Sequence, residues 1–354
     1  MLPFVIAVGA FGLACGLTLW IRRKAAEHRL IDVPNSRSMH ATATPRGGGV
    51  AISTAAIAAI VVLGLANWLA WPAVWSLCGA GGLVALIGFI DDRSGLPPKW
   101  RLLGHFLAAI AAIAVVGGAP PITVHGIALS SPLLGFAFAA AYVVWLLNLT
   151  NFMDGIDGLA ATEGATVCLA AAALCEVAAP GELAWAAPVV VASAILGFLV
   201  WNWPPASIFM GDAGSGFLGM TFGLLSLQAG WVSDRLFWSW IILLGVFVVD
   251  ATMTLIIRVA RGEKAYLAHR SHAYQQAALR MGRHRPVTLA VAAINLFWLL
   301  PVAFLVARGS LGGFVGVLVA YAPLAAVALK LRAGFPFVPG QVKSSGRLRA
   351  PHHR

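Results

Sequence analysis

The chain has 354 residues, of which 60% are hydrophobic and only 10% are charged, and its formal net charge is +11. A soluble domain carries about 25% charged residues. This composition excludes an ordinary soluble globular protein and indicates a membrane protein.

Long apolar runs follow one another along most of the chain. A bilayer core requires about 20 consecutive apolar residues per helix. Runs of about this length cover residues 2–21, 48–67, 73–90, 103–118, 132–149, 160–178, 184–201, 214–231, 236–257, 288–306 and 311–329. They predict an all-α polytopic integral membrane protein with about 11 transmembrane helices, or about 10 if the Ala-rich run at 160–178 does not cross. We expect one transmembrane domain over 1–331 and a basic, disordered tail over 332–354.

The basic residues gather in alternate loops between these runs. All Lys and Arg residues except Arg235 and Arg308 lie after the first, third or ninth run or near the C-terminus. Lys and Arg are retained on the cytoplasmic side, where they also meet anionic membrane lipid. We therefore expect a bacterial inner-membrane protein with its N-terminus periplasmic and its C-terminus cytoplasmic. The net charge is a topology signal and not a sign of nucleic-acid binding.

The first polar cluster is the segment GFIDDRSGLPPKWRL at 88–102, where Asp91 and Asp92 end the third run and Lys99 follows a Pro-Pro turn. Adjacent carboxylates repel each other, so a cation is usually needed to keep both ionised. Solvated side chains at a helix end are the simpler alternative. The pair predicts a polar site at the expected cytoplasmic face.

The second cluster is NLTNFMDGIDGLAATEG at 148–164, where Asn148, Asn151, Asp154 and Asp157 recur every three residues. This spacing keeps them on one side of a helix or tight turn. Oxygen-bearing side chains suit a hard cation or the donor groups of a nucleoside. An ordinary Asn/Asp/Gly-rich turn is the alternative interpretation.

The third cluster is NWPPASIFMGDAGSGFLG at 202–219, which contains Asn202, Phe209 and Asp212. A Gly-rich turn into a helix leaves backbone N–H groups free to meet phosphate, and an adjacent aspartate suits Mg²⁺. Asp212 as a simple helix cap and Phe209 as an interfacial aromatic are the alternatives.

The fourth cluster, AHRSHAYQQ at 268–276, holds His269 and His272 in the long basic loop after the ninth run. We expect these histidines to meet anionic oxygen atoms rather than a transition metal. Asp250, inside the ninth run, is expected to bond to a neighbouring helix.

Together these motifs resemble those of the polyprenyl-phosphate N-acetylhexosamine-1-phosphate transferases. The matching segments are DVPNSRSMHATATPRGGG (32–49), the Asp91-Asp92 pair with Lys99, NxxNxxDGIDGL (148–159), the stretch from Asn202 to GDAGS, and HRSH (269–272). The peptidoglycan branch carries three consecutive histidines where this chain has H-R-S-H. The sequence is therefore more similar to the surface-polysaccharide branch, which starts O-antigen and related lipid-linked glycans.

The resemblance implies transfer of a sugar 1-phosphate from a UDP-N-acetyl-hexosamine (GlcNAc, FucNAc or QuiNAc type) to undecaprenyl phosphate at the cytoplasmic face, releasing UMP. Magnesium is the expected cofactor, with manganese as the alternative, and a homodimer is left open. The roles implied are Asp212 and Asp91 as metal ligands, Asp91, Asp92 and Lys99 at the lipid phosphate, His269 and His272 at the sugar phosphate, and Asn148, Asn151, Asp154, Asp157, Asn202 and Phe209 around the nucleotide.

Two other functions are considered. A phospho-N-acetylmuramoyl-pentapeptide transferase of peptidoglycan synthesis would share the same motifs. A secondary transporter or flippase would need acidic residues near mid-membrane and internal repeat symmetry. Only Asp250 lies away from the ends of an apolar run, and no repeat is evident.

Overall fold

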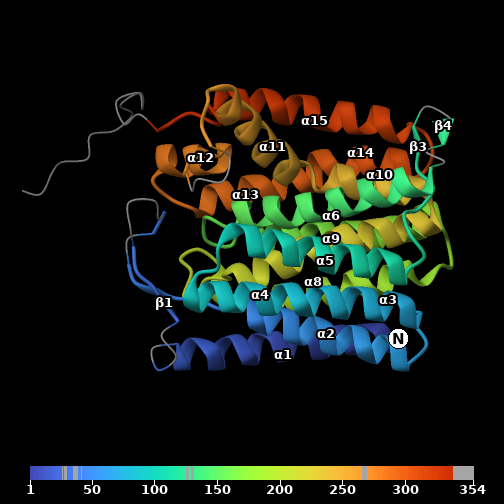
Figure 1. Ribbon diagram of the computed structural model, residues 1–354, viewed down its shortest axis with the longest axis horizontal. Helices are drawn as coiled ribbons and strands as arrows, with labels where there is room; N and C mark the ends of the chain where they lie inside the picture. The colour runs from blue at the N-terminus through green and yellow to red at the C-terminus, as the bar shows by residue number, and fades with distance from the viewer. Residues whose placement is uncertain are drawn as a thin grey trace, which may run out of the picture.

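Each expected apolar run forms a helix or a series of consecutive helices in the computed structural model, which describes residues 1–25, 27, 30–34, 39, 40, 42–124, 127, 128, 131–264 and 269–337. The helices lie side by side along the long axis of the molecule (Figure 1). The helices are α1 (Leu2–Lys24), α2 (Gly49–Leu65), α3 (Trp71–Trp75), α4 (Gly81–Ser94), α5 (Pro98–Val115), α6 (Pro132–Met153), α7 (Leu159–Ala178), α8 (Ala186–Asn202), α9 (Asp212–Val232), α10 (Asp234–Leu243), α11 (Gly245–Ala260), α12 (Ala273–Met281), α13 (Arg285–Ile294), α14 (Leu300–Ala307) and α15 (Gly313–Lys330).

Short elements complete the chain. Two π-helical turns, η1 (Ser76–Ala80) and η3 (Asn295–Leu299), join α3 to α4 and α13 to α14, and the 3₁₀ turn η2 (Leu183–Trp185) precedes α8. Two small antiparallel pairs are formed by β1 (Ile31–Asp32) with β2 (Thr44–Pro45) and by β3 (Thr123–Val124) with β4 (Ile127–Ala128).

The helix lengths agree with a polytopic membrane protein. Within the described residues, eight helical stretches are long and apolar enough to cross a bilayer, or nine if α10 and α11, which meet at a 64° bend, count as one. The 11 runs expected from the sequence correspond to these stretches together with α2, which has 17 residues, and α9.

Helix α9 lies at the centre of the bundle, and nearly all of its residues from Ala213 to Gly230 are buried. A Cβ atom at Gly49 on α2 would collide with the backbone of Gly214, and one at Gly219 would collide with the backbone of α6 at Leu147. Small residues let helix backbones approach closely in lipid, where the hydrophobic effect does not drive helices together. Glycines therefore set the spacing of α2, α6 and α9.

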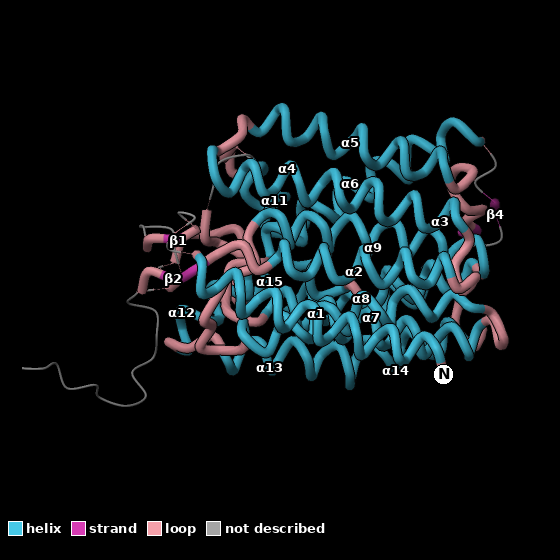
Figure 2. The backbone as a smooth tube through the Cα atoms, turned by 90° about the horizontal axis from the view of Figure 1, so that it is seen from below, coloured by secondary structure: helices cyan, strands magenta, loops and turns pink. Residues whose placement is uncertain are grey.

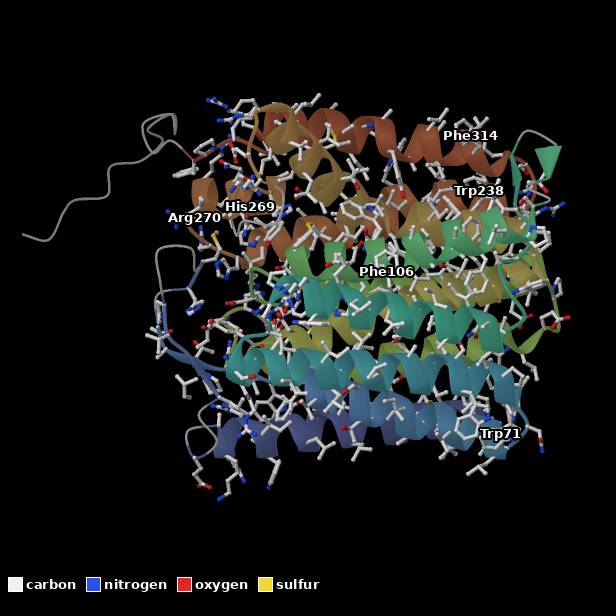
Figure 3. All side chains as sticks on the ribbon, viewed as in Figure 1. Trp71, Phe106, Trp238, His269, Arg270 and Phe314 are labelled. Carbon is white, nitrogen blue, oxygen red and sulfur yellow. The ribbon has the colours of Figure 1, made fainter. Side chains whose placement is uncertain are left out.

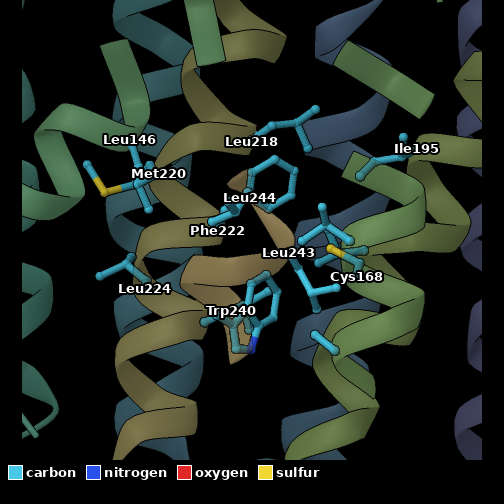
Figure 4. Close-up of a cluster of buried hydrophobic side chains, with 14 of the residues drawn as sticks. Leu146, Cys168, Ile195, Leu218, Met220, Phe222, Leu224, Trp240, Leu243 and Leu244 are labelled. Carbon is cyan, nitrogen blue, oxygen red and sulfur yellow. The ribbon is translucent and has the colours of Figure 1, made fainter. Parts of the chain in front are cut away.

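Large side chains fill the remaining space between the helices. Phe222 and Leu224 of α9 belong to the same cluster of buried hydrophobic side chains as Leu243 and Trp240 of α10 (Figure 4). The core is mostly apolar, with a few buried polar side chains such as Glu163 and Asn295 within it.

The two ends of the bundle differ. The β1–β2 pair and α12 lie at one end, whereas the N-terminus and the β3–β4 pair lie at the other (Figures 1 and 2). Figure 3 places His269 at the first end and Trp71, Trp238 and Phe314 toward the second, where aromatic residues are typical of a membrane interface. The polar motifs of the sequence therefore gather at one end.

The packed chain continues past residue 331, where we expected the transmembrane domain to finish. Ala333 is fully buried, the Gly334 N–H donates to the Ser271 carbonyl (2.8 Å), and the Phe335 carbonyl accepts from the Gln276 side chain (2.8 Å). Residues 338–354 of the expected disordered tail lie outside the described residues.

The contact between α2 and α9 yields a testable prediction. Gly49→Ala would force two helix backbones apart, and overpacking of this kind costs about 1–3 kcal/mol. We expect a lower thermal unfolding midpoint of the purified protein in detergent. Gly12→Ala is the matched control, because a Cβ there meets nothing within 4 Å. An unchanged midpoint for Gly49→Ala would contradict the α2–α9 contact.

Candidate functional site

A cavity of about 250 Å³ opens at the end of the bundle where the polar motifs gather. Its walls come from segments far apart in the chain. The lining residues expected from the sequence are Asp92, Asn151, Asp154, Asp157, Asn202, Phe209 and Asp212, and those not expected include Asp32, His40, Arg46, Ser215, Gln275 and His284.

The amino end of α9 forms one wall, and the end of α4 packs directly against it. A Cβ atom at Gly88 would collide with the backbone of Asp212, so α4 needs glycine at this position. This close approach brings Asp92 to the first turn of α9, where its Oδ2 accepts the Ala213 N–H (3.3 Å). Helix amino ends carry unpaired N–H groups and a partial positive charge, which a carboxylate stabilises. Asp92 therefore caps α9 from another helix.

Arg46, just after β2, holds Asp92 from the other side. Its guanidinium donates to the Asp92 backbone carbonyl, and Nη1 lies 3.8 Å from Asp92 Oδ1. The Asp92 side chain is only 5% exposed, so this cation compensates a carboxylate that water barely reaches. The segment that carries Arg46 is fixed to the next motif, because the Phe209 N–H donates to the Pro45 carbonyl (2.8 Å).

Arg101 joins the first and third motifs. It donates to the Asp91 carboxylate and, at 3.0 Å, to Asp212 Oδ2. The other oxygen of Asp212, Oδ1, accepts from the Asn151 side-chain amide (2.9 Å), which also donates to Ser215 Oγ (3.0 Å). Three predicted residues from separate motifs thus meet in one network around a cation that we did not predict.

Lys99, the basic residue expected in this role, is exposed, lies 5.5 Å from the Trp100 ring centroid and does not line the cavity. Arg101 reaches the carboxylates instead because Pro98 begins α5, and residues two positions apart on a helix point in different directions. Arg101, two residues further along the same segment, is therefore the cation that the structure places beside these carboxylates.

The loop between α6 and α7 contributes the carboxylates of Asp154 and Asp157, whose pKa values are shifted in opposite directions. Burial and three neighbouring carboxylates, chiefly that of Asp212, raise the pKa of Asp154 well above its usual range. Among the described residues, no hydrogen bond or ion pair to the Asp154 side chain is found. Burial would also raise the pKa of Asp157, but the His284 imidazole, whose Nδ1 lies 3.2 Å from Asp157 Oδ1, and the Ala206 N–H (3.1 Å) outweigh it and lower the pKa.

Asn202 connects this loop to the third motif. Its side-chain Oδ1 accepts the Gly158 N–H (3.0 Å), and its Nδ2 donates to the Ile208 carbonyl (2.9 Å). Gly158 has φ of 70°, a left-handed conformation that glycine adopts without strain. Asn148, by contrast, donates only to the Val144 carbonyl of its own helix (2.7 Å) and does not line the cavity. Its expected place beside the nucleotide is not supported.

The two histidines of the motif HRSH, His269 and His272, lie outside the lining of the cavity. His272 is 2% exposed, its Nδ1 lies 3.4 Å from Asp250 Oδ1, and its ring stacks on His269 with centroids 4.8 Å apart. Burial, with the charges of His272 and Arg258 acting in the same direction, lowers the pKa of His269 to about 3. Neither histidine is a cavity-lining residue, so the structure does not bring them together with the other expected site residues.

Asp250 explains how this motif is held. Its carboxylate accepts the N–H groups of Ala273 (2.8 Å) and Tyr274 (2.9 Å), the first residues of α12. The expectation that Asp250 bonds to a neighbouring helix is confirmed. As a result Gln275 lines the cavity, and the Tyr274 hydroxyl donates to the Phe152 carbonyl beside Asp154 (2.9 Å).

His40 and His284 complete the cavity wall, and sequence reasoning did not single them out. His40 Nε2 lies 3.0 Å from Asp32 Oδ2, and its ring contacts Phe209 with centroids 4.8 Å apart. His284 lies between Asp157 and the Met39 carbonyl (3.1 Å). His40 and Arg46 lie in the segment 32–49, which resembles a motif of the family, so the sequence could have pointed to both as site residues. His284 follows α12 and belongs to none of the motifs identified in the sequence.

The donor set suits a hard cation shared with a ligand. No group of three or more His, Cys, Asp or Glu residues within the described chain is arranged as a self-sufficient metal site. Magnesium usually binds one or two carboxylates and completes its shell with water and phosphate oxygens. Asp154, without a protein partner here, lies close enough to Asp212 for their charges to interact. These two carboxylates line the cavity, whereas Asp91 does not line it and its side chain is only 10% exposed, so they fit such a shared ion better than Asp91.

Comparisons with known proteins show which family the chain resembles. The sequence profile of glycosyl transferase family 4 matches residues 74–230. The chain is 29% identical to the probable undecaprenyl-phosphate N-acetylglucosaminyl 1-phosphate transferase of Bacillus subtilis (80% of this chain, 79% of the relative). It is 30% identical to the decaprenyl-phosphate N-acetylglucosaminephosphotransferase of Mycolicibacterium smegmatis (74% of each). It is also 29% identical to the phospho-N-acetylmuramoyl-pentapeptide-transferase of Kocuria rhizophila (86% of this chain, 91% of the relative).

Replacing Asn202 is predicted to destabilise the protein more than replacing Asn148, although both were expected at the site. Asn202→Ala leaves the buried Gly158 N–H and Ile208 carbonyl without partners, which costs about 1–3 kcal/mol. Asn148→Ala removes one contact within a helix and should change stability by less than about 0.5 kcal/mol. Thermal unfolding midpoints of the two variants in detergent compare these effects directly. Equal midpoints would mean that Asn202 does not clamp the two loops.

Proposed function

The chain belongs to glycosyl transferase family 4, within the polyprenyl-phosphate N-acetylhexosamine-1-phosphate transferases, and we propose that it transfers an N-acetylhexosamine 1-phosphate from a UDP-sugar to undecaprenyl phosphate, releasing UMP. The observation that carries the proposal is the meeting of Asp91, Asp92 and Asp212 with Arg46 and Arg101 at one end of an apolar helix bundle. Three carboxylates beside two guanidinium groups suit a divalent cation that would compensate the charge of phosphate-bearing substrates.

The two substrates explain why this site lies at the end of the bundle. A polyprenyl tail stays in the bilayer, whereas a nucleotide sugar stays in water, so their phosphates can meet only where helix ends reach the aqueous phase. The distribution of Lys and Arg supports the cytoplasmic face of a bacterial inner membrane for this end.

The proposed reaction is a direct phosphoryl transfer. An oxygen of the lipid phosphate attacks the β-phosphorus of the UDP-sugar, and the bond from that phosphorus to the bridging oxygen breaks, so UMP leaves and a lipid-diphosphate sugar remains. Several negative charges converge, so positioning and charge neutralisation carry most of the catalysis. Arg101 and Arg46 supply fixed positive charge beside Asp91, Asp92 and Asp212, and those aspartates keep the guanidinium groups in place.

A magnesium ion, or manganese in its place, would neutralise the diphosphate when bound, held by Asp212 and Asp154. Asp92 and Arg46 lie on the side of the cavity formed by α4 and β2, where they suit orientation of the lipid phosphate. The nucleotide would occupy the side formed by Asp157, Phe209 and His284. His269 and His272 would act by supporting α12.

The surface-polysaccharide branch remains the preferred pathway. The H-R-S-H motif differs from the three histidines of the peptidoglycan branch, which favours UDP-GlcNAc or a 6-deoxy relative as donor and an O-antigen-like product. The similarity to a phospho-N-acetylmuramoyl-pentapeptide-transferase keeps that activity as the second candidate. The transporter alternative relied on Asp250, whose oxygens are taken by the backbone of α12.

The proposal predicts UMP release that depends on both lipid and metal ion. Purified protein with undecaprenyl phosphate, Mg²⁺ and a panel of UDP-N-acetyl-hexosamines should release UMP with one donor. UDP-MurNAc-pentapeptide belongs in the panel to test the second candidate. Asp212→Asn should lower the rate by about 100-fold or more while the variant stays folded. Near-wild-type turnover of Asp212→Asn at saturating Mg²⁺ would remove Asp212 from the site.

A second prediction separates the two basic residues of the first motif. Arg101→Ala removes the cation between Asp91 and Asp212, so we expect UMP release to fall by about 100-fold or more. Lys99→Ala, whose side chain is exposed and outside the cavity, should keep activity within about twofold. A larger loss of activity in Lys99→Ala than in Arg101→Ala would show that α5 is rotated so that Lys99, and not Arg101, faces Asp91 and Asp212.

A further inference from the structure

Residues 331–335 follow helix α15 and pack against α11 and α12, and we call them the C-terminal strap. The proposed reaction has no use for this segment. Ala333 is nevertheless fully buried, and it shares a small cluster of buried side chains with Ala273 of α12 and Ala328 of α15, separate from the main core of the bundle. The strap is therefore part of the packed structure at the end that holds the active-site cavity.

Hydrogen bonds join the strap to one face of α12. The Gln276 side-chain amide donates to the Phe335 carbonyl (2.8 Å), and the Arg280 guanidinium donates to the Leu331 carbonyl (3.1 Å). Together with Ala273, these two residues of α12 are spaced three and four positions apart, so all three lie on the same face of the helix. The strap therefore holds α12 along its whole length, from the first turn to the last.

Gly334 fixes the strap between α11 and the histidine motif. Its N–H donates to the Ser271 carbonyl (2.8 Å), and its φ of 80° is a conformation that glycine adopts without strain. A Cβ atom there would lie 2.8 Å from the Ile257 side chain of α11. The Gly334 carbonyl accepts from Arg261 (3.3 Å), whose guanidinium also lies 4.6 Å from the centroid of the Phe335 ring. A shift of the strap would therefore break contacts with both neighbours.

The other side of α12 faces the active site. Gln275 lines the cavity, and the Tyr274 hydroxyl donates to the Phe152 carbonyl beside the carboxylate loop (2.9 Å). Successive residues of a helix are about 100° apart, so these two side chains point well away from the face that holds Gln276 and Arg280. A helix of nine residues is too short to be stable on its own, so its position depends on the contacts around it.

We propose that the C-terminal strap is a positioning element of the active site, which fixes the direction of α12 and thereby the place of Gln275 in the cavity wall. Asp250 holds N–H groups only in the first turn of α12, whereas contacts with the strap extend to Arg280 in the last turn. Gly334 and Phe335 are the positioning residues. The kinetic part of this inference rests on the proposed transferase function, whereas the structural part does not.

The test compares point variants of the whole chain. Gly334→Ala strains the backbone and places a methyl group against Ile257. Phe335→Ala removes the ring beside the Arg261 guanidinium, whereas Phe335→Tyr keeps an aromatic face there. Gly181→Ala is the matched control, because Gly181 has a similar φ of 85° but a Cβ atom there meets nothing within 4 Å.

The first readout is amide hydrogen exchange in detergent, which needs no substrate. Gly334→Ala should speed exchange of the peptide covering α12 by about tenfold, and Phe335→Ala by a smaller factor, with little change in α1 or α5. Phe335→Tyr and Gly181→Ala should leave the exchange of α12 as it is in the wild type.

The second readout is the kinetics of UMP release. In Gly334→Ala the KM of the nucleotide sugar should rise by about threefold or more and kcat should fall by about tenfold, because the cavity wall at Gln275 is displaced. The KM of undecaprenyl phosphate should stay within about twofold, since Asp92 and Arg46 lie on the side of the cavity formed by α4 and β2. A loss of active protein would instead lower kcat alone.

The outcomes separate this inference from the proposed function. Faster exchange confined to α12 in Gly334→Ala and Phe335→Ala, with wild-type exchange in Phe335→Tyr, supports the positioning role. If no donor sugar yields UMP, only the function fails. Wild-type exchange of α12 in both Gly334→Ala and Phe335→Ala, or exchange that rises evenly over all helices in both, would overturn the positioning role. A lower kcat with both KM values unchanged would overturn its kinetic part.

Discussion

The amino end of α9 needs partners for its free N–H groups, and the contact between Asp92 and this helix end organises the rest of the site. Asp92 comes from α4, and it reaches Ala213 because Gly88 lets the α4 and α9 backbones approach. A carboxylate so little exposed requires compensation, which Arg46 supplies from the segment after β2. Three distant parts of the chain thus meet because the free N–H groups at one helix terminus need hydrogen-bond partners at the end of an apolar bundle.

This arrangement also prepares the site for anionic substrates. Arg101 bridges Asp91 and Asp212, and Asn151 fixes the other oxygen of Asp212. The groups are therefore held before any substrate binds, so little reorganisation is needed during a reaction in which negative charge converges. The carboxylate of Asp154 lies among other carboxylates with no protein partner in the described chain, which favours a bound cation at this point.

Two other buried acids serve the structure rather than the chemistry. Asp250 caps α12 from within the bundle, and Glu163 accepts a hydrogen bond from Asn295 at the π-helical turn η3. Carboxyl groups in a membrane interior are costly unless they are paired. Here each is placed where a helix begins or is irregular, since those are the places where backbone groups lack partners within the helix.

The sequence by itself determined the helical runs, because the requirement for about 20 apolar residues is a property of each local window. It also identified loops that line the cavity, since carboxylates and Gly-rich turns stand out against an apolar background. It could not decide which side chains meet. Arg101 rather than Lys99 reaches Asp91, and Asn151 rather than Asn148 reaches Asp212, because helix phase and the packing of α5 and α6 against α9 direct each side chain. His269 and His272 lie behind the cavity because Asp250, some 20 residues earlier in the chain, captures the first turn of α12. Only the tertiary structure brings these residues together, because contacts between distant segments depend on backbone packing that no local pattern encodes.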